Sequence, residues 1–285
     1  MRVMILGASG YLGKKIKQCL ETAGYDVTGV YRVLPTDVDT NRKKCIQADI
    51  AEIRAELQEK NYDWIINCAG VYERKGITLH EVMEANLIFA ARVLDCGAEC
   101  GVRNFLTIDT GLPENINFYS FTKKKFAEFG KFYAEKYGIT FVNILLQMFY
   151  GEDEPGDRFL VGCCRKMLRG EEILLTEGTQ KRDIIYIGDV CNAIKLLLET
   201  PLTGFYNVPL GSGEGIPVRK LMEYMYEVTK SKSPLKFGAV PARENEPDCV
   251  ADMEILTGFG FVIQYPWKQG IEYLCYKLGA NERNE

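Results

Sequence analysis

Short, almost continuously apolar runs alternate with longer amphipathic runs over the first half of the chain. The apolar runs cover 2–8, 26–32, 44–50, 63–70, 104–110 and 139–147. Between them, apolar residues recur at helical spacing, for example over 11–23 and 78–100. Buried strands that alternate with helices are typical of a parallel sheet covered on both faces. The pattern predicts an α/β fold with a doubly wound parallel sheet and right-handed crossovers.

The regularity weakens after residue 149, where glycine, proline and short runs become frequent. Helices are expected at 159–169, 188–200, 217–230 and 266–278, and short strands at 173–175, 183–187 and 204–208. We expect the chain to return to the sheet around 183–208. The predicted domains are therefore a sheet domain, 1–149 plus 183–209, and a smaller α+β C-terminal substrate lobe, 150–182 plus 210–285.

Composition excludes several classes of protein. The chain has 285 residues, of which 47% are hydrophobic, and a net charge of −4, which gives no electrostatic basis for binding nucleic acid or an anionic membrane. No apolar run reaches the ~20 residues of a membrane span, and the N-terminal run does not resemble a signal peptide. The ten cysteines contain no CxxC, and His80 is the single histidine. We therefore expect a cytoplasmic protein with reduced thiols and no metal site.

A glycine-rich turn follows the first predicted strand. Residues 7–13 read GASGYLG, at the junction of a strand and a helix. Backbone at such a turn can approach a pyrophosphate closely, and the first amides of the helix can point at it. The spacing is GxxGxxG instead of the usual GxGxxG, so its position carries the prediction. We therefore expect the sheet domain to be a dinucleotide-binding domain. The residues expected to bind the dinucleotide are Gly7, Ser9, Gly10, Tyr11, Leu12 and Gly13.

The end of the second strand distinguishes between the two nicotinamide dinucleotides. An acidic residue there would accept the ribose hydroxyl of NAD, but the strand ends GVYR, with no carboxylate before Asp37. Arg32 can instead bind a 2′-phosphate, which favours NADP(H) over NAD(H); an Arg32 that only faces solvent is the alternative. Further residues expected at the cofactor are Asp49 and Ile50 beside the adenine, and the small residues Cys68, Ala69 and Gly70.

The stretch NFYSFTKKKF, 117–126, places Tyr119 and Lys123 on one face of a predicted helix. Taken alone, its lysines could be a solvated surface. Together with the glycine turn, however, the chain resembles the extended short-chain dehydrogenase/reductase family of nucleotide-sugar epimerases, dehydratases and reductases. The resemblance runs from Met1 to about Lys277 and depends on GxxGxxG at 7–13, ADI at 48–50, NCAG at 67–70, YxxxK at 119–123 and QKRDIIYIGDV at 180–190. It implies a Rossmann fold.

The resemblance also implies catalytic roles. Tyr119 would be the acid/base, and Lys123 would hold the nicotinamide ribose and lower the pKa of the phenol. Thr110 would orient the substrate oxygen, with Thr107 as the alternative, since the side chains of a strand alternate. Lys124 and Lys125 are expected to be surface residues.

Within the family, the sequence favours a reductase. Dehydratases place an acidic pair after the catalytic Ser or Thr, where this chain has Gly111 and Leu112. The short connection from Thr110 to Tyr119 resembles the bacterial CDP-abequose and CDP-paratose synthases. The implied function is NADPH-dependent reduction of a nucleotide-linked 4-keto-6-deoxy- or 3,6-dideoxyhexose in bacterial surface-sugar (lipopolysaccharide) biosynthesis. The alternatives are a nucleotide-sugar 4-epimerase with tightly held NAD, and a non-catalytic NADPH-binding regulator.

Two further implications concern partners. Arg182 and Arg243 are candidates for binding the substrate diphosphate; surface ion pairs with Asp183 and Glu244 are the alternative. In the family, the helices equivalent to 78–100 and 118–136 pair across a two-fold axis. The resemblance therefore implies a homodimer, although core packing is the default interpretation of their apolar stripes, which are Phe126, Phe129 and Tyr133, and Leu87, Ala91 and Leu94.

Overall fold

The computed structural model describes residues 1–34, 45–155, 158–242 and 247–281. The chain divides into two compact units. The first consists of Met1–Leu146 and Ile194–Val208, and the second of Gln147–Ala193 and Pro209–Glu285. The sequence placed the corresponding boundaries at 149, 182 and 209.

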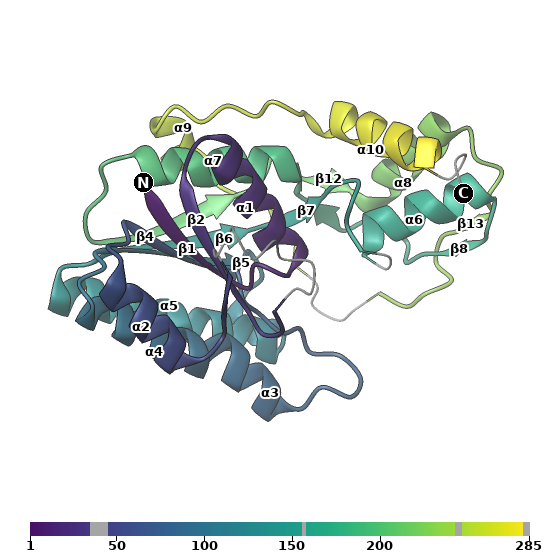
Figure 1. Ribbon diagram of the computed structural model, residues 1–285. Coiled ribbons are helices and arrows are strands. Elements are labelled where there is room, and N and C mark those ends of the chain that lie inside the picture. Colours follow the sequence, from purple (N-terminus) through teal and green to yellow (C-terminus); the bar gives the residue numbers. More distant parts are fainter. Residues whose placement is uncertain (35–44, 156–157, 243–246, 282–285) are drawn as a thin grey trace. The chain divides into compact units, whose positions relative to one another are not determined.

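A seven-stranded sheet forms the centre of the first unit (Figure 1). Its strands are β1 (Arg2–Leu6), β2 (Asp26–Tyr31), β3 (Cys45–Gln47), β4 (Trp64–Asn67), β5 (Asn104–Thr110), β6 (Thr140–Leu146) and β11 (Phe205–Leu210), in the spatial order β11-β6-β5-β4-β1-β2-β3. The strands from β1 to β6 pair in parallel with their neighbours. The predicted α/β fold with a parallel sheet is therefore confirmed.

Helices cover both faces of this sheet, as Figure 1 shows. Helix α1 (Tyr11–Thr22) lies on one face, and α2 (Ile50–Glu59), α4 (Phe89–Glu99) and α5 (Phe118–Tyr137) lie on the other. The second group encloses a core in which Phe126 of α5 packs edge-on against Phe105 and Phe141 of β5 and β6. Burial of such aromatic side chains contributes strongly to the packing that fixes α5 on the sheet.

Two predicted elements differ in detail. The predicted strand 44–50 ends at Gln47, because Asp49 caps the N-terminus of α2, a helix that the sequence pattern did not indicate. The predicted helix 78–100 consists of α3 (Leu79–Met83), a π-helical segment η1 (Glu84–Ile88) and α4. A π segment shifts the register of a helix and is often found at functional sites.

The second unit is less regular. Its helices are α6 (Phe159–Arg169), the start of α7 (Ile187–Glu199), α8 (Val218–Thr229), α9 (Glu254–Gly258) and α10 (Trp267–Asn281). Three small sheets pair β7 (Met148–Tyr150) with β10 (Ile184–Tyr186), β9 (Lys181–Arg182) with β12 (Ile216–Pro217), and β8 (Ile173–Leu174) with β13 (Leu235–Lys236). Within the stretch 183–208, where the sequence predicts a return to the large sheet, β10 pairs with β7, and the strand that joins the large sheet is β11. Among the described helices, none is both long and apolar enough to cross a membrane.

Candidate active site

The strand order places a switch point between β1 and β4, from which the sheet is built outward in both directions. Ligands of open α/β sheets bind at the carboxyl ends of the strands beside such a point. Gly7 directly follows β1, Cys68 directly follows β4, and Thr110 is the last residue of β5. The predicted site residues of the first unit therefore gather at one edge of the sheet.

The glycine turn has the geometry that a dinucleotide needs. Gly7 has a φ of 73°, and a Cβ there would lie 2.8 Å from the backbone N of Ala69. A Cβ on Gly13 would lie 2.4 Å from the carbonyl oxygen of Gly7. Helix α1 begins after Gly10, and no side chain among the described residues caps it, so the amides of its first turn, from Tyr11, Leu12 and Gly13, can receive an anion. Together with the exposed Ser9, this turn fits a diphosphate.

The residues predicted to contact the adenosine half lie at the adjacent strands. Arg32 is exposed and directly follows β2, whereas Asp37 lies outside the described residues. Asp49 accepts hydrogen bonds from the backbone N–H groups of Ala51 and Glu52, at 2.8 and 3.2 Å. Ile50 begins α2 and packs against the core. Contacts of these residues with a nucleotide stay a prediction, and the structure adds a helix-capping role for Asp49.

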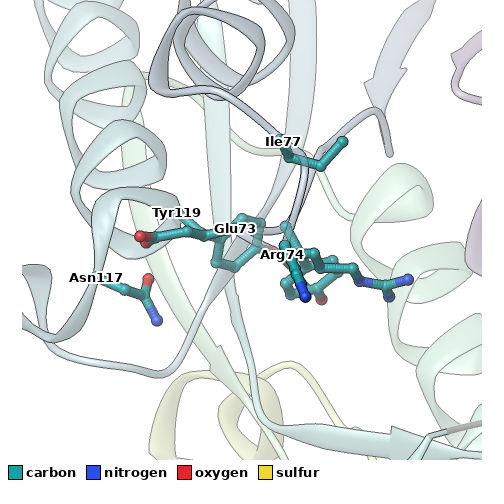
Figure 2. A pocket seen from close by; sticks show the side chains of 7 residues that line it. Glu73, Arg74, Ile77, Asn117 and Tyr119 are labelled. Atoms are coloured by element: carbon teal, nitrogen blue, oxygen red, sulfur yellow. Dashed lines mark hydrogen bonds between the residues drawn. The ribbon is translucent and has the colours of Figure 1, made fainter.

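Tyr119 lines an open pocket of about 480 Å³ (Figure 2). The other lining residues are Asn117 and five residues of the segment that follows β4, namely Tyr72, Glu73, Arg74, Lys75 and Ile77. The rings of Tyr119 and Tyr72 stack with centroids 4.2 Å apart, and their hydroxyl oxygens are 3.5 Å apart. The phenol of Tyr119 is thus presented to a space that a substrate can enter, at the carboxyl edge of the sheet.

Lys123 is not part of a solvated face, because only 3% of it is exposed. Its Nζ donates a hydrogen bond to the carbonyl oxygen of Ala69, at 3.0 Å. A Cβ on Gly70 would lie 3.4 Å from this nitrogen, so Gly70 lies directly beside the lysine head group. Burial lowers the pKa of the Lys123 ammonium to about 8, against the raising effects of Asp109 and Cys68. Burial also raises the pKa of the Cys68 thiol to about 12, so this thiol stays neutral.

Asn86 is a site residue that the sequence reasoning missed. It is fully buried in the π segment, where its Oδ1 accepts the backbone N–H of Val71 at 2.7 Å. Its Nδ2 donates to the carbonyl oxygen of Val71 and to Thr122 Oγ1, at 3.0 and 3.2 Å. Asn86 therefore ties the segment after β4 to the turn of α5 that separates Tyr119 from Lys123. The signal was an asparagine within the apolar stretch that follows Glu84.

The two candidate threonines of β5 have different surroundings. Thr107 Oγ1 accepts a hydrogen bond from Asn67 Nδ2 within the sheet, at 3.2 Å. Thr110 ends the strand, and its Oγ1 accepts the backbone N–H of Leu112 at 3.2 Å. The alternation along the strand thus makes Thr107 a structural residue, and Thr110 is the candidate at the carboxyl edge.

The connection between Thr110 and Tyr119 is short because it is locally closed. A 3₁₀ turn, η2 (Glu114–Ile116), leads into Asn117, which caps α5. Asn117 Oδ1 accepts the backbone N–H of Ser120 at 2.8 Å, and Ser120 Oγ accepts the N–H of Asn117. This capping box fixes the first turn of α5, which carries Tyr119.

Lys124, predicted to be a surface residue, is partly buried instead, since only 22% of its side chain is exposed. Its Nζ lies 3.0 Å from Asp109 Oδ2 and 2.5 Å from the carbonyl oxygen of Thr110. Lys125, one position further along the helix, instead pairs with Glu114 and Glu128. The assumption failed because consecutive helix positions point about 100° apart, so three adjacent lysines have three different environments.

Of the two arginines proposed for the diphosphate, the structure describes Arg182, which belongs to the second unit. Arg182 Nη1 donates to the carbonyl oxygens of Lys181 and Pro247, at 2.7 and 3.1 Å. Asp183 does not serve as its counter-ion in the described contacts, since its carboxylate accepts N–H groups of Ser212 and Ala251. Arg243 lies outside the described residues.

Comparisons with known proteins agree with this arrangement. The family model described as NAD dependent epimerase/dehydratase family matches residues 3–208. The chain is 29% identical to CDP-abequose synthase of Salmonella typhimurium over 97% of its own length and 98% of that protein. It is 23% identical to a putative UDP-glucose 4-epimerase of Methanocaldococcus jannaschii, over 99% of each. The solved structure of MoeE5 in complex with UDP-glucuronic acid and NAD has a TM-score of 0.87, with 20% identity and full coverage of both chains.

The fold and the edge of the sheet thus define a dinucleotide-binding α/β protein with a tyrosine-lysine pair. The chain belongs to the NAD-dependent epimerase/dehydratase family, and the resemblance to the extended short-chain dehydrogenases/reductases is confirmed.

Proposed function

We propose that this protein is an NAD(P)-dependent enzyme that reduces the keto group of a nucleotide-linked 4-keto-deoxyhexose in deoxysugar biosynthesis. The observation that supports this most directly is the buried Lys123 one helical turn after Tyr119, a tyrosine that lines the open pocket. The similarity to CDP-abequose synthase over nearly the full length supports the reductase within the family. It also makes a CDP-linked 4-keto-3,6-dideoxyhexose the first substrate to test.

In this mechanism the nicotinamide cofactor, when bound, supplies hydride. Tyr119 donates its phenolic proton to the carbonyl oxygen of the sugar as that oxygen gains electron density. The hydroxyl of Thr110 donates a hydrogen bond to the same oxygen and stabilises the developing charge. Lys123, held by the carbonyl of Ala69, keeps a cation near the phenol, which favours the phenolate left after proton transfer.

The surroundings of Thr110 argue against elimination of water as the reaction. Gly111 and Leu112 follow it, without the acidic pair that a dehydratase needs. The carboxylate that precedes it, Asp109, is engaged by Lys124 and by Asn143 Nδ2, both at 3.0 Å. A carboxylate oxygen that already accepts from these two groups is not available to contact a substrate.

The cofactor is proposed to be NADP(H), because Arg32 follows β2 where an NAD-specific protein would place a carboxylate. The test is to incubate the purified protein with NADPH or NADH and a series of nucleotide-linked 4-keto-deoxyhexoses, CDP-linked first, and to follow loss of the near-ultraviolet absorbance of the reduced cofactor. We expect consumption of NADPH with at least one 4-keto sugar and a lower rate with NADH.

Other outcomes of this test would identify the alternatives. A 4-epimerase is the second candidate, because the chain is also similar to a putative UDP-glucose 4-epimerase over its full length. That activity would appear as protein-bound NAD and interconversion of two sugar nucleotides without added reductant. Tight NADPH binding without turnover of any sugar would instead indicate a regulator.

We also propose that the protein is a homodimer through α5 and the helical segment 79–99. Of the predicted stripes, Phe126 and Leu94 belong to the core of the first unit, and Tyr133 donates to Asp95. Phe129, the remaining α5 residue of the predicted stripe, is exposed instead. With Phe118, Phe121 and Phe132 it forms an apolar face of α5 whose residues are 44–53% exposed. Four exposed phenylalanines on one helix are unusual for a monomer, so a second copy of this face is the expected cover.

Charging this face should separate the dimer. We expect the double substitution Phe129→Glu and Phe132→Glu to change the mass in solution from two chains to one, measured by light scattering. Val262→Glu, at a 65% exposed position of the second unit, is the matched control and should leave the mass unchanged. A wild-type protein with the mass of one chain would contradict the proposal.

A further inference from the structure

A small polar network surrounds the main chain of Thr110. The Asp109 carboxylate, only 2% exposed as a residue, accepts the N–H of Thr110 through Oδ1 at 2.6 Å. Its Oδ2 accepts from Lys124 and Asn143, while Lys124 also donates to the Thr110 carbonyl. The backbone N–H and the backbone carbonyl of Thr110 are thus both hydrogen-bonded to the Asp109–Lys124 ion pair. A buried carboxylate with these partners has few alternative arrangements.

The Asp109 carboxylate also affects the charge of Lys123. Lys123 is buried, and Asp109 of β5 and Cys68 after β4 act on the charge of its ammonium. Tyr119 and Lys124 are its titratable neighbours along α5. Cys68 is a neutral thiol, and the polar residue of the neighbouring π segment, Asn86, carries no charge. Asp109 is therefore the acidic residue that raises the pKa of the Lys123 ammonium against the effect of burial, and Lys124, 3.0 Å from its Oδ2, is the cation paired with it.

On the basis of the proposed function, we propose that Asp109 and Lys124 are a positioning pair: they fix Thr110 at the carboxyl edge and set the local charge around Lys123. Lys124 is not among the residues that line the pocket, so it would act through Thr110 and Asp109. The pair thus links the threonine that orients the substrate to the lysine that supports the phenol.

The pair makes opposite predictions for its two members. Asp109→Asn removes the anion and should lower the titration midpoint of Lys123, by roughly one pH unit. Lys124→Met removes the neutralising cation and should raise that midpoint, whereas Lys124→Arg should leave it near the wild-type value. The measurement is an NMR titration of isotopically labelled lysine side chains in the free protein, with the Lys123 signal assigned through Lys123→Met.

Lys125→Met is the matched control, because this lysine is adjacent on the same helix and pairs with Glu114 and Glu128 instead. It should change neither the titration nor turnover. Equal or same-direction shifts in Asp109→Asn and Lys124→Met would overturn the proposal, since a loss of folding stability alone does not produce opposed shifts. If Asp109→Asn does not fold, a missing upward shift in Lys124→Met overturns it, because the Lys124 side chain is 22% exposed and its replacement is tolerable.

Turnover tests the Thr110 half of the proposal. With a reducible 4-keto sugar nucleotide, Asp109→Asn and Lys124→Met should each lower kcat about tenfold, and Lys124→Arg should restore most of it. Wild-type kcat in both variants would overturn the positioning of Thr110. The NMR titration needs neither substrate nor cofactor, so it remains decisive even if no sugar nucleotide is reduced, an outcome that would count against the proposed reaction alone.

Discussion

Replacing Tyr119 by phenylalanine should lower kcat by about a hundred- to ten-thousand-fold while cofactor binding stays nearly unchanged. The substitution keeps the ring that stacks on Tyr72, at 4.2 Å, and removes only the hydroxyl that faces the pocket. Without that hydroxyl, proton transfer to the sugar oxygen must use water. The measurements are steady-state reduction of a 4-keto sugar nucleotide and titration of NADPH fluorescence with each protein.

Tyr137→Phe provides the control for this change. Tyr137 is the last residue of the same helix and is 45% exposed, so loss of its hydroxyl should leave kcat unaffected. Wild-type turnover by Tyr119→Phe would refute the acid/base role. An equal loss in both variants would point to a general effect on α5 and not to chemistry.

The sheet could be predicted because its strands are buried on both faces, so that each strand is a nearly continuous run of apolar residues in the sequence. The glycine turn could be predicted because close backbone approach requires absent side chains, and Gly7 and Gly13 have no room for a Cβ. Both features depend on local sequence. The placement of Tyr119 and Lys123 on one face of α5 could also be predicted, because residues i and i+4 share a face in any helix.

The residues that support the site from neighbouring elements could not be predicted in this way. Asn86 lies in a π segment and accepts the N–H of Val71 in the segment after β4, and the spacing of apolar residues did not predict that π segment. The ion pair of Lys124 could not be predicted, because Lys124 lies on α5 and its partner Asp109 lies on β5, so that the contact depends on tertiary packing. Pairings between distant elements are invisible to spacing arguments.

Lys123→Met should lower turnover by roughly a hundredfold and yet make the free protein more stable at neutral pH. Burial lowers the pKa of the Lys123 ammonium from its ordinary 10.5 to about 8, so the charged form is penalised in the folded state. That shift corresponds to about 3 kcal/mol. Loss of the hydrogen bond to Ala69 offsets about 1 kcal/mol, which leaves a gain in unfolding free energy of about 2 kcal/mol.

The stability difference between Lys123→Met and the wild type should depend on pH. Below pH 8 the lysine is protonated in the folded and unfolded chains, so the wild type bears the full cost of the buried charge. Between about 8 and 10.5 the unfolded chain binds more protons, and the stability of the wild type rises with pH. The advantage of Lys123→Met should therefore be largest at neutral pH and disappear as pH approaches 10.5, measured by denaturant or thermal unfolding without cofactor. A constant difference across this range, or a less stable variant at pH 7, would mean that the buried ammonium does not destabilise the folded protein.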